Sequence, residues 1–263
     1  MKKINWFYVA GILLGGLVLL LVIGPLLSIF LKTSFSDLFQ TASDNDVQDS
    51  IIRTLAISFF ATIVCAIGGI PLAYILARKR FPGKKLINII VDIPIVIPHS
   101  AAGIAILGFI SRDTFVGKIS ETMGLNLVGH PGGIAIAMAF VSVPFLINAA
   151  RDGFASVPQQ LEKAALNLGA SPFRVFMSIS LPLAWRNIVS GLVLMFGRGM
   201  SEFGAVVIVA YHPMITPVLI YERFVTFGLK YAQPVSVLFI VVCLFVFALI
   251  RLLARKQEKM INA

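Results

Sequence analysis

Residues Arg151 to Pro182 read RDGFASVPQQLEKAALNLGASPFRVFMSISLP, a polar stretch in a chain that is otherwise strongly apolar. Ser156 is a predicted N-cap, and Gln159 three residues later completes a capping box. An apolar face follows at helical spacing, and its members are Leu161, Ala164, Ala165 and Leu168. Gly169 stands where a helix commonly ends in the left-handed conformation. The stretch therefore predicts a short helix that interrupts the apolar segments.

A second short helix is predicted directly after this glycine. Ser171 and Pro172 supply an N-cap and a first-turn proline. Phe173, Phe176 and Ile179 form an apolar side, and Leu181-Pro182 is predicted to end the helix. Residues 151–182 are thus expected to form a helix–turn–helix loop at a membrane surface.

The composition outside this loop is that of a polytopic membrane protein. Hydrophobic residues make up 58% of the 263-residue chain and charged residues only 13%. We predict an all-α protein with a single transmembrane domain over residues 1–263. Each predicted span is long enough to cross a ~30 Å hydrocarbon core, because a helix rises about 1.5 Å per residue. The six predicted spans cover residues 6–31, 51–77, 87–110, 132–150, 184–210 and 233–254.

The Lys and Arg residues orient these spans. With a cytoplasmic N-terminus, most of the 22 Lys and Arg residues fall in cytoplasmic segments, as the positive-inside rule requires. Lys2 and Lys3 precede an apolar run without a small-residue cleavage pattern, so we interpret this run as a retained span and not a signal peptide. Both termini and the 151–182 loop are predicted to be cytoplasmic in a multi-pass cell-membrane protein. The net charge of +10 follows this topology and does not indicate nucleic-acid binding.

The third predicted span contains helix breakers beside polar residues. Pro94 and Pro98 lie four residues apart and predict a kink or a local break. Asp92 and His99 flank this kink, and Ser100 follows it. Irregular backbone inside a membrane is tolerated where neighbouring helices or a cavity satisfy its polar groups. These five residues are candidates for a translocation pathway or gate, and a kink that serves only helix packing explains them equally well.

The fifth predicted span carries two charges, Arg198 and Glu202, on one helix face and near mid-span. Charges at this depth are costly and usually face a bundle interior or a wet cavity. Two roles stay open, a structural ion pair or a pair that lines or gates the route of a charged solute. An anion is attracted by Arg198 and repelled by Glu202, so we interpret Glu202 as the residue that holds Arg198 in place.

Motifs for catalysis and metal binding are missing from the sequence. It contains no G-x-x-x-x-G-K-[ST] phosphate-binding loop, so the chain is not expected to hydrolyse ATP. No H-E-x-x-H and no Cys/His cluster has metal-ligand spacing. Cys65 and Cys243 both fall inside predicted spans, which argues against a disulfide framework. We therefore expect a chain that is not an enzyme and holds no cofactor or metal of its own.

The 151–182 loop resembles the EAA loop of ABC importer permeases. The match consists of Glu162, the alanine pair after Lys163, Gly169 and, after nine intervening residues, Ile179-Ser180-Leu181-Pro182. The resemblance implies a coupling helix that docks into a groove of a cytoplasmic ATPase subunit. The residues implied in this coupling are Glu162, Ala164, Ala165, Leu168, Gly169 and Pro182. The alternative is an amphipathic helix that rests on lipid, but the alanine-rich face and mixed polar side favour docking.

Two further stretches, Gly69–Ala105 and Gly197–Phe224, extend the resemblance over most of the chain. With the loop, they are similar to the permease subunits of molybdate/tungstate ABC importers, in a wider group that includes sulfate/thiosulfate permeases. Ser201-Glu202-Phe203-Gly204 favours the molybdate/tungstate branch, because the sulfate branch tends to read GE-[YF]-G. The resemblance implies a homodimer in the lipid bilayer, two ABC ATPase subunits that bind ATP and magnesium, and an external oxyanion-binding protein.

A competing hypothesis from another class is an ion-coupled secondary transporter or channel. In that class Asp92, Arg198 and Glu202 would form a proton or ion relay, and the polar loop would be incidental. Inverted repeats would favour this class, and the sequence contains no convincing pair.

Overall fold

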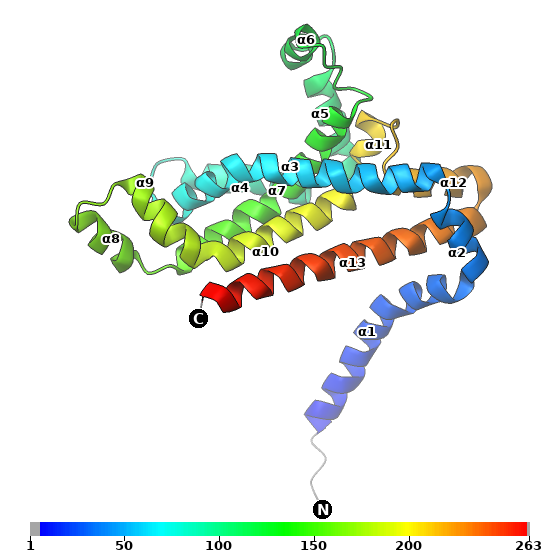
Figure 1. The fold of residues 1–263 in the computed structure, drawn as a ribbon, viewed down its shortest axis with the longest axis horizontal. Helices are drawn as coiled ribbons and strands as arrows, with labels where there is room; N and C mark the ends of the chain where they lie inside the picture. Colours follow the sequence, from blue (N-terminus) through cyan, green and yellow to red (C-terminus); the bar gives the residue numbers. More distant parts are fainter. Residues whose placement is uncertain (1–5, 262–263) are drawn as a thin grey trace, which may run out of the picture.

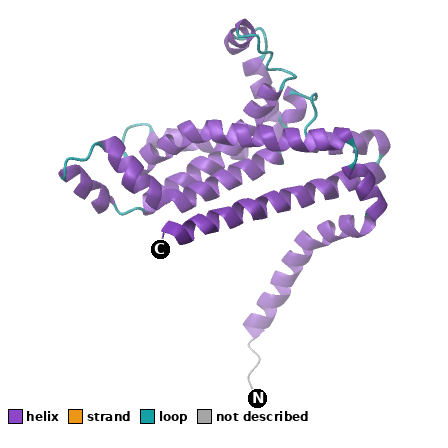
Figure 2. Cartoon of the chain, in the orientation of Figure 1, coloured by secondary structure: helices purple, strands orange, loops and turns teal. Residues whose placement is uncertain are grey.

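The computed structural model describes residues 6–261, and every regular element in that range is a helix (Figure 2). The predicted all-α fold is confirmed. By length and composition, five described helices are able to cross a membrane, and a bent helix pair adds a sixth. The long helices are α1 (Trp6–Lys32), α3 (Asn45–Arg78), α7 (Pro131–Ser156), α10 (Leu181–Met200) and α13 (Leu229–Ile261), and the bent pair is α4 (Lys84–Val96) with α5 (His99–Ile110).

Short helices connect these spans. The loop end of the bundle, at the left of Figure 1, carries α8 (Gln159–Asn167), α9 (Pro172–Val175) and the π-helix η1 (Phe176–Ser180). The opposite end, at the right, carries α2 (Phe35–Ala42) and α12 (Thr216–Phe227). Two more, α6 (Phe115–Thr122) and α11 (Val206–Val209), lie near α5 above the bundle in this view.

Helix α7 is the centre of the bundle and packs against both α3 and α10. Small residues set the distance to α10, since a Cβ on Gly153 would come 2.6 Å from the Asn187 Cβ. A Cβ on Gly191 would likewise come 2.9 Å from the Ala149 Cβ. Close approach of this kind is how membrane helices gain packing energy without a hydrophobic driving force.

Helix α1 stands apart from the bundle. None of its most apolar window is buried, against 56% for the corresponding window of α7. Figure 1 shows α1 leaving the bundle at the α2 end. Lys2 and Lys3, whose charges entered the predicted orientation, lie outside the described residues. The apolar surface of α1 is therefore free to meet lipid or another chain.

The third predicted span is locally broken, one of the two outcomes that its prolines predict. Helix α4 ends at Val96, α5 begins at His99, and their axes differ by 114°. Pro98 sits in the gap and starts α5, while Pro94 lies buried inside α4. A Cβ on Gly103 would come 2.9 Å from the Ala205 carbonyl oxygen, so α5 packs closely on the segment that leads into α11.

The fifth predicted span, 184–210, is too long, because α10 ends at Met200. A turn follows, and α11 begins only at Val206. The Glu202 side chain explains the break, since its Oε1 accepts the Ala205 N–H at 2.9 Å. Such a side-chain bond competes with a continuing helix, and Gly197, Gly199 and Gly204 weaken helix propensity around it. Arg198 and Glu202 therefore do not share one helix.

Two predictions about the loop are also wrong. Ser156 is not an N-cap, because α7 continues through it and its hydroxyl donates to the Gly153 carbonyl. Helix α8 instead begins after Pro158, without a side-chain cap. The second loop helix does not end at Pro182 either, since helical backbone runs from Pro172 to Met200. The π turn widens the helix directly before Pro182, where an α-helical carbonyl would meet the proline ring.

Candidate functional site

The turn at the centre of the 151–182 loop has the structure that its sequence predicts. Gly169 has φ of +87°, so the predicted left-handed turn is confirmed. Ser171 is the N-cap of α9, and its Oγ accepts the Arg174 N–H at 3.3 Å. The two short helices are thus joined by a turn that favours glycine.

Glu162 points into the protein and not toward solvent. Its Oε1 lies 2.8 Å from Nη2 of Arg78 at the end of α3 and accepts the Ser180 hydroxyl at 2.6 Å. The Arg78 guanidinium also donates to the Val157 carbonyl at 2.9 Å. Both charged side chains are at least nine-tenths buried, with exposed fractions of 6% and 10%. Glu162 therefore connects α8 with α3 and with the π turn.

Arg78 and Ser180 were not among the predicted site residues. Arg78 is the first of three consecutive basic residues, a pattern typical of a charge cluster at a membrane surface. Its spacing of four residues from Tyr74 was the available signal, because that spacing puts both on one helix face. Tyr74 is packed inside, in an edge contact with Phe154 at 5.2 Å between ring centroids.

The other face of α8 is apolar and exposed. Leu161 is 46% exposed and the C-cap residue Leu168 is 88% exposed, with Ala164 on the same open side. Ala165 is half-buried. Between α3 and α8 lies a cavity of about 270 Å³ whose lining includes Lys79, Lys163 and Leu166. The loop thus presents a small apolar ridge bordered by basic side chains.

A second cluster forms where two breaks between helices lie next to each other. It joins His99 at the start of α5, Arg198 near the end of α10 and Glu202 in the following turn. Arg198 Nη2 lies 3.1 Å from Glu202 Oε2 and 2.8 Å from His99 Nε2. His99 Nδ1 lies 2.8 Å from the same Glu202 oxygen. The structure therefore confirms that Arg198 and Glu202 meet, and it adds His99.

One arrangement of hydrogens satisfies both partners of the imidazole. A guanidinium only donates and a carboxylate only accepts. His99 meets both when Nδ1–H donates to Glu202 and Nε2 accepts from Arg198, whose Nη2 also lies 3.0 Å from Nδ1. Exposure is asymmetric, since the Glu202 side chain is 1% exposed, Arg198 27% and His99 39%. The buried side of the cluster is acidic, and its open side is basic.

Asp92 belongs to a different polar contact. Its Oδ1 accepts the Asn148 amide at 2.7 Å, between α4 and α7. One turn earlier, Asn88 accepts from Arg151 at 3.2 Å. The Asn148 carbonyl oxygen is buried without a partner in the described part of the chain. Of the residues predicted near the break, Ser100 is exposed at the start of α5.

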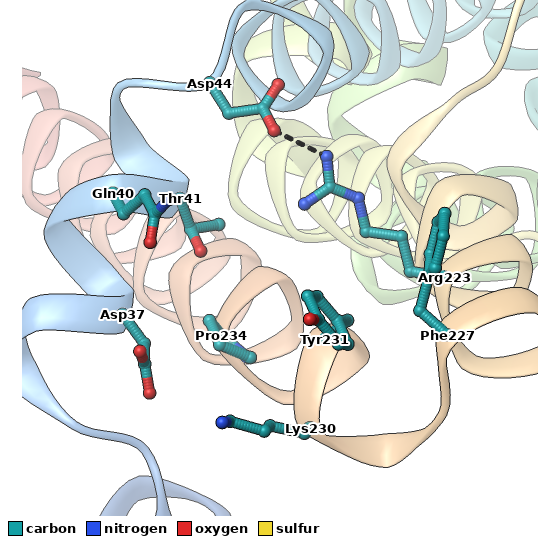
Figure 3. A pocket seen from close by; sticks show the side chains of 9 residues that line it. All are labelled: Asp37, Gln40, Thr41, Asp44, Arg223, Phe227, Lys230, Tyr231 and Pro234. Carbon is teal, nitrogen blue, oxygen red and sulfur yellow. Dashed lines mark hydrogen bonds and ion pairs between the residues drawn. The ribbon is translucent and has the colours of Figure 1, made fainter.

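The largest of the cavities described here, about 530 Å³, lies at the opposite end of the bundle (Figure 3). Asp44 accepts from Arg223 Nη2 at 2.6 Å on one side, with Asp37 and Lys230 on the other. Burial alone would raise the pKa of Asp44, but the hydrogen bond and charge of Arg223 outweigh it and hold that pKa below its usual 3.8. The cavity therefore combines acidic and basic groups.

Comparison with known proteins identifies the fold family. The model for binding-protein-dependent transport system inner membrane components matches residues 69–259. The chain belongs to this family. It is accordingly a multi-pass inner membrane component of a transport system, and the described helices fit that role.

Several relatives of this transport component are similar over most of their length. The molybdate/tungstate transport system permease protein WtpB of Methanocaldococcus jannaschii is 41% identical, covering 88% of this chain and 91% of its own. WtpB of Thermococcus kodakarensis is also 41% identical, over 93% and 95%. A probable sulfate transport system permease protein cysT, from Chlorokybus atmophyticus, is 32% identical over 86% and 81%.

A solved structure shares the fold of this transport component. A bacterial ABC transporter involved in the import of the acidic polysaccharide alginate contains a chain with a TM-score of 0.74 at 17% identity. The match covers 95% of this chain and 96% of that one. The two chains therefore share their overall fold.

Proposed function

We propose that this chain is the membrane permease of an ATP-driven importer for molybdate or tungstate. The observation that carries the proposal is its 41% identity to molybdate/tungstate permeases over about nine-tenths of both chains. Similarity to the sulfate permease is lower, at 32%. Import of sulfate is therefore the second candidate function.

The 151–182 loop supports ATP coupling. Its exposed ridge, formed by Leu161, Ala164 and Leu168, is the surface that enters a groove of a cytoplasmic ATPase subunit. Glu162 positions this ridge from behind through Arg78 and Ser180. Gly169 forms the turn between α8 and α9, and Pro182 lies where the π turn passes into α10. Docking of this loop requires that it faces the cytoplasm, as the charge distribution indicates.

The docking loop also indicates how many copies of this chain the importer contains. One chain carries one docking loop, so two ATPase subunits call for two copies of the chain. The unburied apolar surface of α1 supports a homodimer in which this helix meets the partner copy. An external binding protein delivers the oxyanion at the α2 and α12 end, opposite the docking loop.

The ion-coupled alternative fits the geometry less well. It needs a continuous relay through Asp92, Arg198 and Glu202. The described contacts pair Asp92 with Asn148, while Arg198 and Glu202 pair with each other and with His99. The three charged groups thus fall into two separate clusters.

Competitive uptake tests the proposal. Vesicles that hold this chain, its candidate ATPase and its binding protein receive tungstate, molybdate and sulfate together, and elemental mass spectrometry measures the contents. We expect tungsten or molybdenum to accumulate over sulfur, and only with ATP. Preference for sulfur moves the assignment to the sulfate branch, and uptake without ATP contradicts an ATP-driven importer.

Co-purification tests the docking surface. Leu168→Asp places a charge on the exposed ridge and should abolish recovery of the ATPase with this chain. Met123→Asp is the matched control, because Met123 is 73% exposed on a loop away from the ridge. Equal recovery with both variants contradicts docking through Leu168.

A further inference from the structure

We propose that Arg198 forms a transient contact site for a tetrahedral oxyanion inside the permease, with Glu202 as its buried counter-ion and His99 as a positioning residue. This inference rests on the proposed function. It adds the residues that the solute contacts on its way through the membrane, after it enters and before it is released.

Charge asymmetry is the first argument. Glu202 is 1% exposed, while the two basic side chains that it contacts are 27% and 39% exposed. An anion that approaches from the open side meets the Arg198 guanidinium before the carboxylate. Ser201 and Ser100 are also exposed, and the Ser201 hydroxyl accepts from Arg198 Nη1 at 3.2 Å. Guanidinium groups and hydroxyls are the donors that oxyanions prefer.

The backbone gives the second argument. Two breaks coincide here, the gap between α4 and α5 and the turn between α10 and α11. Irregular backbone at membrane depth occurs where it is buried in protein or lines a wet cavity. In transporters, broken helices commonly form the solute site. The exposed basic groups distinguish this break from one that serves only packing.

The cluster is also held rigid. A Cβ on Gly204 would come 2.7 Å from the His99 Cβ, so the turn lies directly on the start of α5. Glu202 fixes both basic groups through one oxygen and caps the turn through the other. A rigid site loses little entropy when an anion binds.

Glu202 also limits the strength of binding. A lone buried arginine would hold a divalent anion tightly, and transport requires that the solute leaves. Because Glu202 already neutralises Arg198, the oxyanion must compete with a carboxylate 3.1 Å away. The arrangement therefore suits a brief contact, with high affinity left to the binding protein.

The test uses the assembled transporter in vesicles and three variants. Arg198→Gln removes the charge, and Arg198→Lys keeps it without the planar fork. The double variant Arg198→Gln/Glu202→Gln removes both charges and so leaves no buried acid unpaired. Each is measured for yield, for ATP hydrolysis stimulated by the loaded binding protein, and for tungstate uptake.

We expect the double variant to assemble and to hydrolyse ATP as the wild type does, while its tungstate uptake falls about tenfold, the loss of one charge-assisted contact. The tungstate uptake of Arg198→Lys should lie between that of the wild type and that of the double variant. Uptake of the double variant at the wild-type rate overturns the site, because the pair would then be structural. Failure of the wild type itself to take up tungstate or molybdate contradicts the proposed function instead.

Chemical modification tests whether an oxyanion contacts Arg198 directly. Phenylglyoxal, which modifies exposed arginine, should react with Arg198 more slowly in the presence of tungstate than of an equal concentration of chloride. Rates are read by peptide mass spectrometry, with Arg112 as an internal reference. Equal protection of both arginines, or of neither, contradicts a specific anion contact.

Discussion

At the residue scale, the loop acid Glu162 has a different role from the one its sequence position indicates. It faces Arg78 and Ser180 within the same chain, and the apolar side of α8 faces outward. Glu162 is therefore expected to influence a partner ATPase only through the position of α8.

A single variant and a double variant test this role. Glu162→Ala leaves the Arg78 guanidinium buried and unpaired, so it should destabilise the chain by about 3 kcal/mol. The pair Arg78→Met/Glu162→Leu should recover most of this loss, because both charges leave together. Thermal unfolding of the purified chain measures the effect, and Lys163→Ala, an exposed charge beside it, serves as the control. Unchanged stability of Glu162→Ala together with loss of the ATPase would mean that Glu162 contacts the partner directly.

The Asp44–Arg223 pair makes a pH-dependent contribution at the other end of the bundle. The pKa of Asp44 is lower in the folded chain than its usual 3.8, mainly because Arg223 outweighs the effect of burial. A lowered carboxyl pKa stabilises the fold above the unfolded pKa, and the contribution is lost as pH falls through the folded value. We expect Asp44→Asn to lower the melting temperature near neutral pH and to match the wild type only in acid, once the pH lies below the folded pKa of Asp44.

Asparagine is the right replacement because Asp44 also caps α3, accepting the Asp46 N–H at 2.9 Å. Asn retains the cap and removes the charge. Arg223→Gln should give the same pH profile from the other side of the pair. A difference from wild type that persists unchanged into acid would show that the charge pair is not its cause.

At the scale of elements, close contact at glycine holds the broken spans together. Gly204→Ala should destabilise the chain by about 1–3 kcal/mol, because the new methyl group would overlap His99. Gly197→Ala is the matched control, since no neighbouring atom lies within 4 Å of its Cβ position. It should be neutral or slightly stabilising, as expected for alanine in a helix. The melting temperature and the uptake are measured for both variants. Equal effects of Gly204→Ala and Gly197→Ala contradict the packing argument.

Local signals explain which elements were predictable. Pro94 and Pro98 indicated a disturbed third span, and Gly169 indicated the left-handed turn, because both depend on the backbone of single residues. The end of α10 was not predictable from periodicity, since it depends on the side chain of Glu202. The partnership of Glu162 with Arg78 joins positions 84 residues apart, and hydrophobic spacing contains no information on such a contact.

At the scale of the whole molecule, one helix connects the two functional regions. Helical backbone continues for 29 residues from Pro172, in the proposed docking loop, to Met200, beside the Arg198 cluster. At about 1.5 Å per residue it is roughly 43 Å long. Because a packed helix transmits displacement, ATP-driven movement of the loop should reach the cluster through α10.

A break in the middle of this helix tests the connection. Ser190 lies on the exposed side of α10, and its hydroxyl donates to the Arg186 carbonyl. Ser190→Pro removes a backbone hydrogen bond and kinks the helix at a cost of about 3 kcal/mol, while Ser190→Ala removes only the hydroxyl. The proline variant should still recover the ATPase and hydrolyse ATP, because the loop is intact, but its uptake should fall about tenfold, a barrier increase of about 1.4 kcal/mol. The alanine variant should behave as the wild type. Full uptake by a folded proline variant would show that movement reaches the Arg198 cluster by another route, through α7 or α3, and that α10 is only a support.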